Sequence, residues 1–144
     1  RKDAMNAKEY LNQARHLNNR IKSFQNELDY INTIALGPSG PSYGPDKIKR
    51  QPNLEAPFVR YIDKIMELEN IIQDEISKLF ALKQNIARTI AEVGDAKLEI
   101  ILRERYINCR NWEDIAIDLA YSQVYLYKLH QRAIKLIKVP QEYS

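Results

Sequence analysis

The sequence predicts an all-α protein in which a long antiparallel, coiled-coil-like helical hairpin precedes a C-terminal helix-turn-helix domain. Apolar residues recur at heptad spacing over two long stretches, and two short amphipathic patterns follow each other near the C-terminus. The composition agrees, since the 144 residues include only four glycines. We expect residues 1–94 to form the hairpin and residues 95–144 to form the second domain.

The first predicted helix spans about residues 8–36. Its apolar residues alternate at spacings of four and three, which is the narrow seam of a coiled coil. These residues are Tyr10, Ala14, Leu17, Ile21, Phe24, Leu28, Ile31 and Ala35. Most residues between them are polar or charged, which suits a solvated face.

A proline- and glycine-rich loop at residues 37–53 separates the two long helices, because its prolines interrupt any regular helix. The loop ends in Lys47, Lys49 and Arg50, so a nucleic-acid contact is one interpretation. A solvated loop is the favoured one, because loops are generally polar.

The second predicted helix spans about residues 56–93. One seam repeats every seven residues through Phe58, Ile65, Ile72, Leu79, Ile86 and Val93, with Ile62, Ile76 and Ile90 at the other seam position. A further stripe through Leu68, Ile71 and Leu82 widens the apolar face. This surplus predicts a homodimer or higher homo-oligomer. The alternative is that the C-terminal segment covers the stripe.

Three shorter helices are predicted after Gly94, which suits a helix C-terminus, and Asp95, which suits the next N-cap. The first, from Ala96 to about Cys109, buries Leu98, Ile101, Leu102 and Tyr106. The second is capped by Asn111 and buries Trp112, Ile115, Ala116 and Leu119. After a turn at Ala120 and Tyr121, the third begins at Ser122 and buries Leu126, Leu129, Ala133 and either Leu136 or Ile137.

Charge divides these last two helices sharply. The earlier one carries Glu113, Asp114 and Asp118, whereas the last one has basic but no acidic residues. Because Lys and Arg neutralise phosphates and Gln pairs with adenine edges, this face predicts DNA binding. The predicted DNA-binding residues are Ser122, Gln123, Val124, Tyr125, Tyr127, Lys128, Gln131, Arg132 and Lys135. The alternative is a solvated helix flank, and the net charge of +3 is too small to decide.

Other functions find little support in the sequence. We expect no enzyme, cofactor or metal site, because the chain has no HExxH, CxxC or phosphate-binding glycine loop. Cys109 is the only cysteine and is expected to be a structural thiol, and His130 a half-exposed polar residue. No apolar run reaches the ~20 residues of a membrane span, so we expect a cytoplasmic protein.

The run LRERYINCRNWEDIAIDLAYSQVYLYKLHQRAIKLI resembles the region 4 helix-turn-helix of bacterial sigma-70 factors. It departs from that pattern at Ala120, where the family usually has Gly. The whole chain, including MNAKEYLNQARHLNNRI from Met5, is similar to the ArpU- and RinA-like late regulators of Gram-positive phages and prophages.

The resemblance implies a DNA-binding regulator that acts in the bacterial host cytoplasm on promoter-region double-stranded DNA, most simply as an activator of late genes. It places Gln123, Val124, Tyr127 and Lys128 against the bases, and Met5 at the native start. The alternative is a protein-interaction module that binds RNA polymerase or another regulator through the hairpin or the sigma-like domain.

Overall fold

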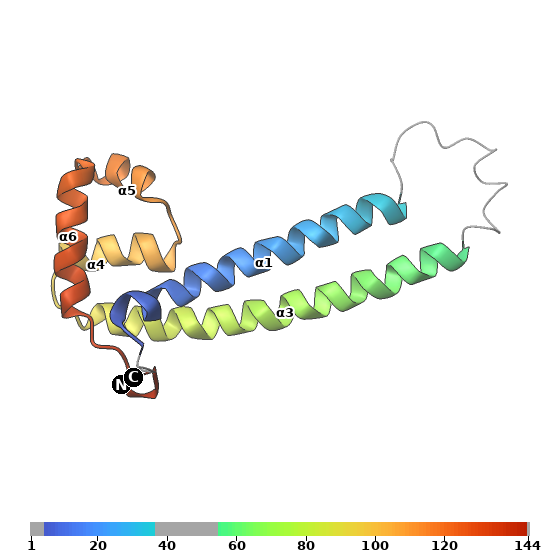
Figure 1. The fold of residues 1–144 in the computed structure, drawn as a ribbon, viewed down its shortest axis with the longest axis horizontal. Coiled ribbons are helices and arrows are strands. Elements are labelled where there is room, and N and C mark those ends of the chain that lie inside the picture. The colour runs from blue at the N-terminus through green and yellow to red at the C-terminus, as the bar shows by residue number, and fades with distance from the viewer. Residues whose placement is uncertain (1–4, 37–54, 144) are drawn as a thin grey trace. The chain divides into compact units, whose positions relative to one another are not determined.

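The computed structural model describes residues 5–36 and 55–143, without the side chains of Leu36 and residues 55–58. All regular structure in these ranges is helical, which confirms the predicted all-α class. The elements are α1 (Ala7–Leu36), α3 (Glu55–Ala91), α4 (Ala96–Leu102), a π-helical segment (Arg103–Ile107), α5 (Trp112–Leu119), α6 (Gln123–Leu136) and a 3-10 turn (Gln141–Tyr143) (Figure 1). The predicted loop at 37–53, with its three basic residues, lies outside the described residues.

Contacts divide the chain into two compact units. The first unit combines Arg1–Asn19 with Lys78–Ser144, and the second is Arg20–Ser77. The ends of the long helices therefore belong with the C-terminal helices. The domain boundary expected at residue 94 stays a prediction.

In the second unit, α1 and α3 run in opposite directions. Arg20 pairs with Glu75 at 3.3 Å, and Glu27 lies 3.9 Å from Lys64. Ile21, Leu68 and Ile72 are buried between these pairs. All described α1 positions of the predicted seam are buried or half-buried, as expected.

At the second seam position of α3, the prediction is confirmed for Ile90, which is buried, but wrong for Ile62 and Ile76. Buried or half-buried positions repeat at Leu68, Glu75, Leu82 and Thr89, whereas Ile62 and Ile76 are 37% and 41% exposed. Two of these seam residues are polar, so the apolar pattern concealed them. Each has a partner: Glu75 pairs with Arg20, and the hydroxyl of Thr89 lies 3.2 Å from that of Tyr10.

The stripe that motivated self-association is consequently covered within the chain. Leu68 is only 1% exposed, Ile71 is half-buried, and Leu82 packs against the core of the first unit. The expectation that this stripe is free is wrong.

The core of the first unit joins both ends of the chain to the short helices. Tyr10 and Ile86 pack with Ile101, Tyr106 and Leu129 in a single buried cluster. The described ends also meet, because the Met5 amide donates to the Tyr143 carbonyl at 3.3 Å. The first residues of α1 are therefore part of the framework that holds α4, α5 and α6.

The boundary between α3 and α4 follows the predicted signals. Gly94 has φ +79°, and the Asp95 carboxylate accepts from the Leu98 amide at 3.1 Å. The next helix ends earlier than predicted, because regular α-helix stops at Leu102 and the π-helical segment follows. Cys109, expected to be helical, has φ 57°, in the left-handed region, and it is half-buried.

Candidate nucleic-acid interface

Both short helices begin at their predicted caps. Asn111 Oδ1 accepts from the Asp114 amide at 2.9 Å, and Ser122 Oγ accepts from the Tyr125 amide at 3.1 Å. Such caps satisfy backbone donors that a helix leaves unpaired at its start. Between the helices Ala120 adopts φ 59°, so the sequence makes the left-handed turn without glycine.

α6 packs against α4 and α5 along one face (Figure 1). The predicted core residues Leu126, Leu129 and Ala133 are at most 2% exposed. At the helix end Ile137 is buried and Leu136 is 47% exposed, which settles the two alternatives. Most of the remaining α6 side chains are exposed to solvent.

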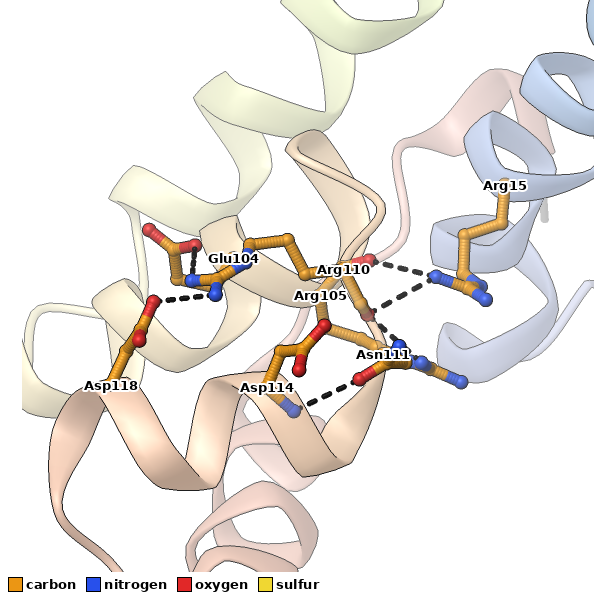
Figure 2. A network of polar contacts seen from close by, with 7 residues as sticks. All are labelled: Arg15, Glu104, Arg105, Arg110, Asn111, Asp114 and Asp118. Atoms are coloured by element: carbon orange, nitrogen blue, oxygen red, sulfur yellow. Dashed lines mark hydrogen bonds and ion pairs between the residues drawn. The ribbon is translucent and has the colours of Figure 1, made fainter.

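A network of arginines ties α1 to the turn before α5 (Figure 2). Arg15 Nη1 donates to the carbonyl oxygens of Arg105 and Arg110 at 3.5 and 3.3 Å. Arg110 forms ion pairs with Glu104 and Asp118, at 2.9 and 2.5 Å. Asp118 of α5 therefore stabilises the structure, because its ion pair holds α5 to the preceding turn.

The predicted DNA-binding residues lie on the solvent side of α6. Ser122, Gln123, Lys128, Arg132 and Lys135 are exposed, while Gln131 is half-buried. The hydrophobic side chains Val124, Tyr125 and Tyr127 are 67%, 40% and 63% exposed. The structure gives no ion pair to the three basic residues within its described ranges. Their charges therefore face solvent uncompensated.

Tyr125 has an additional contact that the sequence did not indicate. Its ring packs edge-on against Tyr121, with centroids 5.0 Å apart, and Lys97 Nζ lies 3.3 Å from its hydroxyl. This hydrogen bond is the main cause that raises the pKa of Lys97. Lys97 thus adds a cation beside the start of α6, and Tyr125 is partly occupied in holding it.

A cleft of about 340 Å³ opens beside α6. Gln123, Tyr127 and Gln131, which recur every four residues, line it from α6, and Lys8 and Asn12 face them from α1. The wall is completed by Arg105, Tyr106, Trp112, Leu126 and His130. Val124, Lys128, Arg132 and Lys135 lie outside the cleft, so the predicted surface consists of two neighbouring rows.

His130 is a correction to the expected half-exposed residue. It is 4% exposed, and its Nε2 lies 2.7 Å from the Tyr106 hydroxyl. Burial lowers the pKa of His130 to about 4, assisted by the charges of Lys8 and Arg105, and burial raises the pKa of Tyr106 to about 12. Both groups are therefore neutral near pH 7, and His130 offers no charge to a phosphate.

Sequence patterns gave no indication of Lys8, Asn12, Lys97 or Arg105 as site residues. Lys8 and Asn12 lie at the start of a helix whose pattern indicated only a coiled coil, and Lys97 and Arg105 precede the helix-turn-helix. Their position beside α6 depends on contacts far apart in the chain.

Among the described residues no group of three His, Cys, Asp or Glu side chains is placed to hold a metal ion. In the same ranges, every helix is too short or too polar to cross a membrane. Comparisons with models of known families, with curated proteins and with solved structures gave no match.

Proposed function

We propose that the protein is a sequence-specific regulator of transcription that binds promoter-region double-stranded DNA through α6. The observation that carries this proposal is the capped pair α5 and α6, whose second helix exposes Lys128, Arg132 and Lys135 without ion-pair partners in the described structure. An exposed amphipathic helix with such a face suits the major groove.

The side chains divide by their position on α6. Gln123, Val124, Tyr127 and Lys128 belong to its first two turns and would reach base edges, as recognition helices do with their N-terminal residues. Arg132 and Lys135 lie further along and would meet phosphates. Lys97, next to Tyr125, adds a third phosphate contact.

The proposed regulator is a homo-oligomer, most simply a dimer. Exposed apolar residues recur along one side of α3 in the second unit, namely Val59, Ile62, Met66 and Ile76, with exposed fractions of 54%, 37%, 56% and 41%. They fall at heptad positions 59, 62, 66 and 76. A second copy would bury this row and supply a second reading helix for a two-fold site.

The resemblance to sigma region 4 and to phage late regulators supports a role at phage or prophage promoters, as an activator of late genes. RNA polymerase or another regulator is the second candidate partner. Ile117 on α5 favours it, because this side chain is 74% exposed on a helix whose other apolar residues are buried or half-buried.

The test is selection of bound duplexes from a random DNA pool by the full chain. A DNA-reading protein enriches one motif, and Gln123→Ala and Lys128→Ala weaken binding to it by about 5- to 150-fold while changing random DNA little. Tyr30→Ala, an exposed change far along α1, is the matched control. A pool without enrichment would reject the proposal of sequence-specific binding.

A further inference from the structure

We propose that the cleft between α1 and α6 binds a small organic anion with a planar ring, and that this ligand competes with DNA for α6. The competition rests on the proposed function, whereas binding of the anion does not.

The charges that line the cleft are all positive. Lys8 and Arg105 face it, and neither forms an ion pair in the described part of the chain. No carboxylate belongs to its described wall. His130 and Tyr106, which also line the cleft, are neutral near pH 7. A bound anion would meet two cations that form no ion pair in the described structure.

Of the two cations, Arg105 has the more unusual surroundings. Its guanidinium stacks over Trp112 at 4.5 Å from the ring centroid, and Nη1 donates to the Arg110 carbonyl at 3.0 Å. Its Nε is shielded from solvent and has no hydrogen-bond partner, and burial together with Arg15 lowers the pKa of Arg105. Glu113 is the carboxylate whose charge acts on Arg105, and its effect is the smallest of the causes. A half-buried cation without an ion pair is costly, so a ligand that supplies a negative charge is favoured.

The volume of the cleft and its lining side chains indicate the size and shape of the ligand. A volume of about 340 Å³ is at the lower end of small-molecule sites, about 300–1,000 Å³. Trp112, Tyr127 and Leu126 give apolar and aromatic surface, which suits a single flat ring. The amides of Asn12, Gln123 and Gln131 can donate to the oxygens of a carboxylate or phosphate.

Competition follows from the shared residues. Gln123, Tyr127 and Gln131 line the cleft and also belong to the predicted DNA surface. A ligand held between them and Lys8 would occupy the first turns of α6, where bases are read. The ligand would therefore weaken binding to DNA, and by linkage DNA would weaken binding of the ligand.

The experiment uses the full chain without DNA and the fluorescence of Trp112, which is the only tryptophan. Benzoate and phenyl phosphate are the probes, titrated at constant ionic strength, with benzamide as the neutral match and inorganic phosphate as the anion without a ring. We expect saturable changes with at least one aromatic anion, and none with benzamide. Lys8→Gln should weaken binding about 5- to 10-fold, whereas Lys22→Gln on the same helix should not.

Saturation by neither aromatic anion, or equal effects of benzamide, would overturn the proposal. So would full binding by both Lys8→Gln and Arg105→Gln, provided that circular dichroism shows both variants folded. If inorganic phosphate binds as tightly as the aromatic anions, the proposal that the ligand contains a ring is rejected. In a second arm, the probe should lower the affinity for the selected duplex. If the probe binds but leaves the affinity for the duplex unchanged, the competition is rejected and the anion site is retained. If the protein binds no duplex at all, only the proposed function is rejected.

Discussion

The Tyr106 hydroxyl and His130 Nε2 form a buried 2.7 Å hydrogen bond that joins the π-helical segment to α6. Trp112 also packs edge-on against the imidazole, with ring centroids 4.6 Å apart. The pair thus holds α6 against the segment that precedes α5. Burial disfavours the charged form of this imidazole, and the charges of Lys8 and Arg105 add to the effect, so His130 is neutral near pH 7.

Acid should therefore destabilise the protein through His130. Burial lowers the pKa of His130 from 6.5 to about 4, so between these values the unfolded chain holds a proton that the folded chain lacks. This contribution to stability is complete above pH 6.5 and is lost as the pH falls toward 4, by about 3 kcal/mol. Denaturant unfolding at several pH values measures it.

His130→Gln is the control, because the amide can still hydrogen-bond to Tyr106 but does not titrate. Its free energy of unfolding should lack this part of the pH dependence. Parallel curves for the wild type and the variant between pH 7 and pH 4 would show that His130 titrates normally.

A second prediction concerns Tyr10 and Thr89, whose hydroxyls are 3.2 Å apart in the core of the first unit. Thr89→Val leaves the Tyr10 hydroxyl buried without its partner and should cost about 1–3 kcal/mol. The double variant with Tyr10→Phe should cost less than the sum of the single changes. Urea unfolding of all four proteins gives the coupling energy, and strict additivity would disprove the bond.

Ala120→Gly should stabilise the protein. Ala120 has φ 59°, and a left-handed conformation costs a residue with a Cβ about 1–2 kcal/mol. Glycine loses about 0.5–1 kcal/mol more backbone entropy on folding, so the net gain is about 0.5–1 kcal/mol. Ala116→Gly, inside α5, should instead destabilise it. A lower melting temperature for Ala120→Gly would contradict the turn geometry.

A single charged substitution in the exposed row on α3 tests the proposed self-association. Met66 is 56% exposed within the row formed with Val59, Ile62 and Ile76. Met66→Lys should dissociate the oligomer without changing helix content, and Lys22→Glu on α1 should leave it intact. Sedimentation gives the answer, and a wild-type monomer at tens of micromolar (about the range of modest interfaces) would remove this proposal.

Local sequence signals predicted the local structure well. The caps at Asp95, Asn111 and Ser122 and the turn at Gly94 act within a few residues, so composition and spacing reveal them. The α1 seam followed in the same way from its apolar repeat. Whether Leu136 or Ile137 is buried required the structure, because both positions fit the helical spacing.

Features that depend on contacts between residues far apart in the chain could not be predicted from the sequence. The seam of α3 includes Glu75 and Thr89, which are buried because Arg20 and Tyr10 meet them from α1. The cleft escaped for the same reason, since Lys8 and Gln123 are far apart in the chain yet line one cavity. The burial of His130 likewise depends on Tyr106 and Trp112.

The central claim is that α6 binds DNA with its uncompensated cations. The most direct measurement is the salt dependence of binding to a duplex for the wild type and for the double variant Arg132→Gln, Lys135→Gln. Each lost phosphate contact should lower the slope of log K against log salt by about 0.9, so the double variant should lose about two units. Lys22→Gln should leave the slope unchanged. An unchanged slope in the folded double variant would contradict the claim.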